Sequence, residues 1–284
     1  MPLRATRAAP IVPGMPRVAA IQMTSGPDVP ANLRQARALL EEAAGRGAEL
    51  AALPENFSFM GLADGDKRRV AEEDGRGPVQ DFLAESARRL GMWIVGGTVP
   101  LRTASDGRVA AACLVHDSAG QRRARYDKIH LFDIQVPDRA ESYRESANVA
   151  PGSTPVVVET PVGRLGLSVC YDVRFPELFR RLSAGGAQLL AVPAAFTEPT
   201  GRAHWETLVR ARAIENLCFV LAPAQSGLHP SGRETYGDSM IVDHWGRVID
   251  RLPRGCGCIA ADIDLERQRR DRGSFPSLTH RVLN

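Results

Sequence analysis

The segment GLSVCYDVRFPEL, residues 166–178, contains the transition on which the fold prediction rests. The apolar residues 165–170 predict a buried strand, and Pro176 predicts the start of a helix. Cys170 ends the strand, so a strand-to-helix turn would hold its thiol out of the sheet, where following backbone N–H groups can face a developing oxyanion. Cys170 is therefore a candidate nucleophile, with a buried structural cysteine as the alternative.

Short apolar runs and helical patterns alternate on both sides of this segment. We expect helices at residues 31–46, 78–90 and 202–216 and one that begins at Pro176. We expect strands at residues 17–22, 48–53, 92–99, 109–116, 121–127, 156–159, 165–170, 188–192, 218–223, 239–243, 247–251 and 258–263, and a long irregular stretch at 129–154. Many of these strands are apolar along their whole length, which is typical of sheets covered on both faces. The pattern predicts an α/β fold with two packed sheets and helices outside.

Length and composition exclude several classes of protein. The chain has 284 residues with 36 basic and 33 acidic side chains, and the net charge of +3 gives no reason to expect a nucleic-acid partner. No apolar run approaches the roughly 20 residues of a membrane-spanning helix, so we expect no membrane partner. Five cysteines cannot all pair within one chain, and we expect a reducing, cytoplasmic location.

The ends of the chain suggest one domain with an N-terminal extension. Residues 1–15 carry two Arg, no acid and three Pro, and they lack the apolar stretch of a secretory signal. We expect a disordered tail there, with a transit signal or a true start at Met15 as alternatives. No linker divides residues 16–284, which we expect to form a single domain.

The basic residues are unusual in kind, because 34 of the 36 are Arg and only Lys67 and Lys128 are Lys. An ammonium is compact whereas a guanidinium is a wide planar fork, so a retained Lys can mark a site that needs the smaller group. Lys128 follows a predicted strand in RYDKIHLFD and is a candidate for such a site. Lys67 lies in the polar run DGDKRR, where we expect a solvated charge.

A cysteine nucleophile needs a base. Glu55 ends a fully apolar strand in LPENF, where a charge has no packing motive, and it is the preferred candidate. A cysteine–histidine pair with His130 or His204 stays open as an alternative. The motif Cys256-Gly257-Cys258 lacks the second pair of ligands of a zinc site, so we expect no metal there.

Three segments resemble the signatures of the nitrilase, or carbon–nitrogen hydrolase, superfamily. They are LPENF at 53–57, YDKIHLFD at 126–133 and GLSVCYDVRFPEL at 166–178, in the family's order, and the resemblance extends over residues 16–280. It implies a four-layer αββα sandwich. It also implies that Glu55, Lys128 and Cys170 form a catalytic triad, with the family's second active-site glutamate at Glu145 in YRESANVAPG.

The resemblance implies an amidase that needs no metal or organic cofactor. Glu55 would accept the thiol proton while Cys170 attacks a small-molecule amide, and Lys128 with the backbone N–H of Tyr171 would hold the oxyanion. Ammonia would leave, and water would then release the acid from the thioester. Glu145 would orient Lys128 and the substrate. Tyr171 and Arg174 are the candidate substrate-binding residues, Arg174 for a substrate carboxylate.

Further segments resemble one branch of this family, the Nit amidases: AHWETLVRARAIEN (203–216), FVLAPAQSGLH (219–229) and YGDSMIVDHWGRVI (236–249). The second of these and RETYG after it are closer to the deaminated-glutathione amidases, which makes deaminated glutathione the favoured substrate. The alternatives are an ω-amidase acting on α-ketoglutaramate or α-ketosuccinamate, an acyltransferase, and a catalytically silent binding protein. The intact triad argues against the last. The helix at 202–216 corresponds to a family interface element, so we expect a homodimer or a larger homo-oligomer.

Overall fold

The computed structural model describes residues 14–104, 107–135 and 142–283, so most of the expected N-terminal tail lies outside the described residues. The first large sheet contains β1 (Arg17–Gln22), β2 (Leu50–Ala52), β3 (Trp93–Val95), β4 (Val99–Arg102), β5 (Val109–His116), β6 (Arg122–Asp127), β9 (Val149–Ala150) and β18 (Gly257–Asp262). Its strand order is β18-β1-β2-β3-β5-β4, and β6 and β9 also pair with β5.

The second large sheet contains β10 (Val157–Thr160), β11 (Gly163–Leu167), β12 (Leu189–Ala191), β13 (Phe219–Ala222), β16 (Ser239–Val242) and β17 (Val248–Leu252). These strands pair in that order along the sheet. Two small ribbons complete the β structure: β7 (Asp133–Gln135) with β8 (Ser142–Arg144), and β14 (Ser226–Leu228) with β15 (Glu234–Tyr236).

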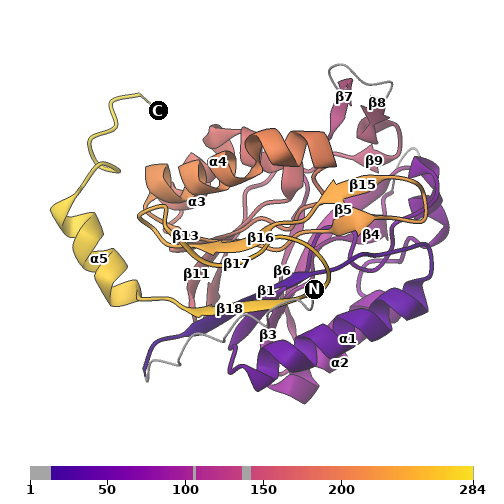
Figure 1. Cartoon of the computed structure of the whole chain (residues 1–284), viewed down its shortest axis with the longest axis horizontal. Helices are drawn as coiled ribbons and strands as arrows, with labels where there is room; N and C mark the ends of the chain where they lie inside the picture. Colours follow the sequence, from indigo (N-terminus) through magenta and orange to yellow (C-terminus); the bar gives the residue numbers. More distant parts are fainter. Residues whose placement is uncertain (1–13, 105–106, 136–141, 284) are drawn as a thin grey trace, which may run out of the picture.

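Helices cover the outer faces of both sheets (Figure 1). Helices α1 (Val29–Gly45) and α2 (Pro78–Leu90) pack on the first sheet, and α3 (Pro176–Ala184) and α4 (Glu198–Asn216) pack on the second. The sheets contact each other through β1, β13 and β16. The predicted αββα sandwich is therefore confirmed. None of the helices in the described ranges is long and apolar enough to cross a membrane.

The period-two pattern of the strands explains why apolar runs build this sandwich. In β1, Val18 and Ala20 pack into the core between the sheets, whereas Ala19 and Ile21 pack into the core beneath α1 and α2. Successive side chains of a strand point to opposite faces, so a strand buried on both faces must be apolar at every position.

The structure differs from the expected elements in several places. The stretch expected to be irregular at 129–154 contains β7, β8 and β9, the helix expected at 202–216 begins at Glu198, and the ribbon of β14 and β15 was not expected. The strand expected at 92–99 is divided into β3 and β4, because the chain turns at Gly97, whose φ is +48°. The helix α5 (Leu265–Ser274) has no counterpart in the sequence analysis. Its sequence LERQRRDRGS carries almost no apolar periodicity, and Gln268 is its one buried residue.

The turn at Gly97 fixes the position of the loop that follows β2. A Cβ at this position would lie 2.0 Å from the carbonyl oxygen of Pro54. Two features therefore exclude a side chain at Gly97: its left-handed backbone conformation, and the close contact with Pro54, the residue before Glu55.

We predict that Gly97→Ala lowers the free energy of unfolding by about 2–5 kcal/mol, because backbone strain and overpacking add. Gly75→Ala is the matched control, since Gly75 has a φ of +85° with nothing within 4 Å of its added Cβ, and should cost about 1–2 kcal/mol. Chemical denaturation of both variants measures the difference. Equal losses would show that the contact with Pro54 is unimportant.

Candidate active site

Four of the predicted site residues meet at one end of the two sheets. Glu55 follows β2, Lys128 follows β6, and Glu145 begins the short 3₁₀ helix η2 (Glu145–Ala147). Cys170 begins η3 (Cys170–Arg174), directly after β11 of the other sheet. All four line one open pocket that encloses about 620 Å³. The fold thus brings together residues that are up to 115 positions apart in the sequence.

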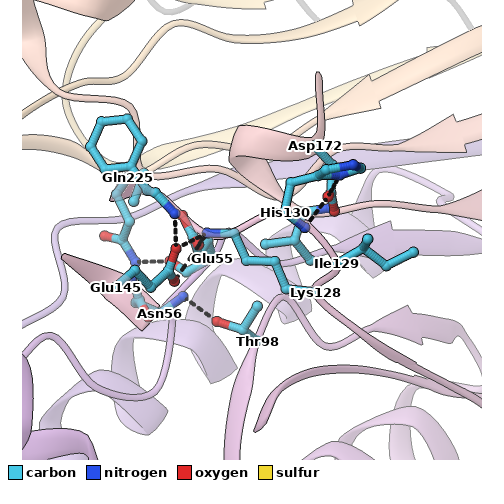
Figure 2. A network of polar contacts seen from close by, with 12 residues as sticks. Glu55, Asn56, Thr98, Lys128, Ile129, His130, Glu145, Asp172 and Gln225 are labelled. Atoms are coloured by element: carbon cyan, nitrogen blue, oxygen red, sulfur yellow. Dashed lines mark hydrogen bonds and ion pairs between the residues drawn. The ribbon is translucent and has the colours of Figure 1, made fainter. Parts of the chain in front are cut away.

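The centre of the site is the Lys128 ammonium, which lies between two carboxylates (Figure 2). Its Nζ is 2.8 Å from Oε1 of Glu55 and 2.8 Å from Oε2 of Glu145. Only 1% of Lys128 is exposed. Burial alone would lower the pKa of Lys128, but the charges of Glu145 and Glu55 outweigh it and raise this pKa well above its ordinary value. Lys128 is therefore a permanent cation.

The same ammonium keeps Glu145 ionised. Burial would raise the pKa of this carboxyl, but the positive charges of Lys128 and Lys67 lower it. The backbone N–H of Phe132 also donates to Glu145 Oε2, over 2.7 Å. Glu145 is thus fixed as an acceptor and serves as an anchor for the lysine.

The backbone of Glu55 is held by residues from both halves of the chain. Gln225 Nε2 donates to the carbonyl oxygen of Glu55 over 3.0 Å, and the N–H of Asn56 donates to Oγ1 of Thr98 over 2.8 Å. Asn56 has a φ of +56°, so the chain turns sharply after Glu55. This turn explains why a charged residue follows an apolar strand: it leaves the sheet and enters the pocket.

Cys170 occupies a similar turn. Its φ is +51°, in the left-handed region, and its N–H donates to the carbonyl oxygen of Pro193 over 2.8 Å. Burial raises the pKa of the Cys170 thiol, and the negative charge of Glu55 raises it further. Lys128 and the backbone N–H of Ala195 act in the opposite direction but do not compensate. Burial and the neighbouring charge of Glu55 therefore both favour the neutral thiol of Cys170.

A buried carboxylate joins the lysine segment to the cysteine turn. Asp172 is fully buried and accepts hydrogen bonds from Tyr126 Oη at 2.7 Å and from the N–H of Val169 at 2.8 Å. It also accepts from the N–H of His130 at 3.0 Å and contacts the Nδ1 of that ring at 2.7 Å. Figure 2 shows His130 turned toward Asp172.

The surroundings of the two histidines bear on the choice between the candidate bases. His130 is bound to Asp172, and His204 Nδ1 contacts Arg174 at 3.3 Å. No histidine is among the described residues that line the pocket, whereas Glu55 is. The arrangement favours the carboxylate over a cysteine–histidine pair. No cluster of three histidine, cysteine or acidic residues suited to a metal ion occurs in the described ranges.

Tyr171 lines the pocket as expected, but Arg174 does not. The guanidinium of Arg174 lies over the rings of Tyr171 and Phe196, at 5.7 and 5.2 Å from their centroids. It therefore packs against two residues of the pocket wall, and its role in binding a substrate carboxylate stays a prediction.

Lys67, in contrast to Arg174, lines the pocket although no role in the site was expected for it. It lies on the 3₁₀ helix η1 (Asp64–Arg69) and lines the pocket together with Arg233, which the sequence analysis did not single out. The expectation of a merely solvated charge at Lys67 is therefore wrong. The available signal was the Arg-to-Lys ratio, because both lysines of the chain belong to this one pocket. Nothing local distinguished Arg233 from the other 33 arginines.

Comparison with known proteins agrees with this geometry. Residues 17–272 match the family model described as carbon-nitrogen hydrolase. The chain belongs to this family. It is an amide-cleaving hydrolase of the nitrilase superfamily, and its three signature segments form the pocket described above.

Several relatives of this carbon–nitrogen hydrolase carry the name deaminated glutathione amidase. The protein of Yersinia enterocolitica is 43% identical over 93% of this chain and 92% of its own length. That of Synechocystis is 45% identical over 93% and 97%. Among solved structures, the NitFhit protein of C. elegans has a TM-score of 0.88 at 40% identity, covering 96% of this chain and 66% of that one. Nit3 of Saccharomyces cerevisiae has a TM-score of 0.83 at 28% identity, covering 95% and 97%.

We predict that Asp172→Asn lowers kcat by about 100-fold, because an amide NH₂ would face donors that now share a carboxylate and would displace the Cys170 turn. The free energy of unfolding should fall by about 2–3 kcal/mol. Steady-state kinetics on an amide substrate and chemical denaturation measure the two effects.

Tyr126→Phe is the matched control for this prediction. It removes one donor from Asp172 and leaves the carboxylate intact, so stability should fall by only about 1 kcal/mol. An Asp172→Asn enzyme with unchanged kcat would contradict the positioning role.

Proposed function

We propose that this carbon–nitrogen hydrolase is a cysteine amidase that cleaves deaminated glutathione, with Glu55, Lys128 and Cys170 as its catalytic residues. The observation that carries the mechanism is the geometry of one pocket, in which Cys170 lies with Glu55 and Lys128 and the Lys128 Nζ is 2.8 Å from Glu55 Oε1. The substrate is supported by the names of the relatives at 39–45% identity.

In the first half of the reaction, Cys170 Sγ attacks the amide carbonyl while its proton passes to Glu55. The carbonyl oxygen becomes an oxyanion, which the Lys128 ammonium and the backbone N–H of Tyr171 stabilise. The C–N bond then breaks, and Glu55 returns the proton to the departing nitrogen. A thioester on Cys170 and a free amine result.

In the second half, a water molecule enters where the amine left. Glu55 takes a proton from this water as its oxygen attacks the thioester, and the proton then passes to the sulfur as the C–S bond breaks. The products are a carboxylic acid and the neutral thiol. Glu145 stays paired with Lys128 throughout and orients it.

The identity of the leaving group depends on the substrate. In deaminated glutathione the scissile nitrogen belongs to the cysteinylglycine part, so the amine released is that dipeptide. Ammonia is released only from primary amides such as α-ketoglutaramate, so the ammonia expected in the sequence analysis fits the ω-amidase alternative and not the favoured substrate. An assay of ammonia alone would therefore miss this activity.

The test is a comparison of kcat/KM on deaminated glutathione, followed by release of cysteinylglycine, with kcat/KM on α-ketoglutaramate, followed by release of ammonia. We expect deaminated glutathione to be the better substrate. Preference for α-ketoglutaramate would reassign the enzyme as an ω-amidase, and turnover of neither would contradict the proposal.

Removal of the nucleophile tests the mechanism in the same assay. We predict that Cys170→Ala lowers kcat by at least about 10⁴-fold, because no thioester can form. Cys113→Ala is the matched control, since Cys113 is equally buried but lies within β5, and it should keep nearly full activity. Circular dichroism checks that both variants fold. Substantial turnover by Cys170→Ala would exclude this mechanism.

A further inference from the structure

A second hollow adjoins the catalytic pocket on its outer side. It encloses about 590 Å³ and is bounded by residues 60–63 and Ser231. Four residues line both spaces: Asn56, Lys67, Tyr143 and Arg233. The reacting residues Cys170, Glu55, Lys128 and Glu145 line only the inner pocket. A substrate longer than a simple amide would therefore extend from the inner pocket past these shared residues into the outer hollow.

Two cations stand at the boundary between these spaces. Within the described ranges, neither Lys67 nor Arg233 forms an ion pair with an acidic side chain, although neighbouring Arg69 pairs with Asp66 at 3.1 Å. Most partly buried guanidinium groups in proteins are paired, because desolvating a charge is costly. The charge of Lys67 also acts on Glu145, but no acidic side chain among the described residues forms an ion pair with either cation. Two such cations on one cavity wall therefore suggest an anionic ligand.

Two contacts fix the guanidinium of Arg233 without using all of its N–H donors. Its guanidinium donates to the carbonyl oxygen of Ala195 over 2.9 Å and lies over the ring of Tyr143, 5.1 Å from the centroid. Its Nε is buried and has no hydrogen-bond partner among the residues that the structure describes. The guanidinium lines both spaces, and a guanidinium fixed in this way is well suited to a carboxylate, which accepts two parallel hydrogen bonds.

The distribution of charge shows where an anion would bind. At the inner end, two carboxylates face one ammonium, so an additional anion beside Glu55 and Glu145 is disfavoured. At the outer boundary, Lys67 and Arg233 supply two positive charges. A substrate carboxylate is therefore favoured away from the scissile bond, at the boundary with the outer hollow.

The order of the reaction shows which part of the substrate reaches this boundary. The acyl part stays on Cys170 after the first half of the reaction, whereas the amine part must leave before water can enter. The amine part therefore lies on the open, outer side. We propose that Lys67 and Arg233 form a specificity site that binds the carboxylate of the leaving group and selects peptide-like amides over primary amides. This inference rests on the proposed function.

The test uses three substrates: deaminated glutathione, its analogue with the glycine carboxylate converted to a carboxamide, and α-ketoglutaramate. Lys67→Gln and Arg233→Gln should each lower kcat/KM for deaminated glutathione by about 10- to 100-fold, mainly by raising KM. Arg233→Gln should not change kcat/KM for the carboxamide analogue or α-ketoglutaramate appreciably. Lys67→Gln also removes a charge that acts on Glu145, so it is judged by the ratio of kcat/KM on the acid to kcat/KM on the carboxamide, which should fall by about 10-fold or more. Lys67→Arg, which keeps the charge, should retain most of the preference for the acid.

Arg69→Gln is the matched control, because Arg69 lies on the same 3₁₀ helix, carries the same charge and does not line the pocket. It should leave all three values unchanged. Equal losses on the acid and the carboxamide in either variant, or a loss on α-ketoglutaramate in Arg233→Gln, would overturn the specificity site alone. Absence of wild-type turnover on all three amides would overturn the proposed function, and this inference with it.

Discussion

The buried ammonium of Lys128 is the constraint on which the rest of the site depends. A charge removed from water must be paired, and here two carboxylates from separate segments supply that pairing. Glu55 follows β2, Lys128 follows β6 and Glu145 lies in η2. The two ion pairs of Lys128 therefore hold these three segments of the chain in place relative to one another. A compact ammonium can lie between two carboxylates where a planar guanidinium would need a wider space. That difference gives a physical reason for a lysine here in a chain that otherwise uses arginine.

The same cluster acts on the Cys170 thiol. Burial raises the pKa of this thiol, and the negative charge of Glu55 raises it further. In the proposed mechanism Cys170 therefore attacks as its proton leaves for Glu55, unlike a stable thiolate paired with an imidazolium. The charge also changes along the site, from carboxylates at the inner end to the cations Lys67 and Arg233 at the outer boundary. An elongated substrate with a terminal carboxylate is oriented by this difference in charge before any bond is broken.

Much of the fold and the centre of the site could be predicted from sequence, because both depend on local patterns. Uninterrupted apolar strands predicted the two covered sheets, and residues out of place at strand ends, Glu55 and Cys170, identified the pocket. What depends on tertiary contact could not be predicted. Arg174 lies close to Cys170 in sequence but packs on the rings of two pocket residues, whereas Lys67 and Arg233 line the pocket from segments distant in the sequence. Helix α5 carries no apolar periodicity and was missed for that reason.

In the proposed mechanism the amide is cleaved through a thioester on Cys170. The direct test is rapid mixing of the enzyme with deaminated glutathione, acid quenching within the first turnover and mass spectrometry of the digested protein. We expect an added α-ketoglutaryl group on the peptide that contains Cys170, formed together with the first equivalent of cysteinylglycine. Product accumulation with no adduct at any time, or an adduct on Cys113 or Cys218 in place of Cys170, would contradict it.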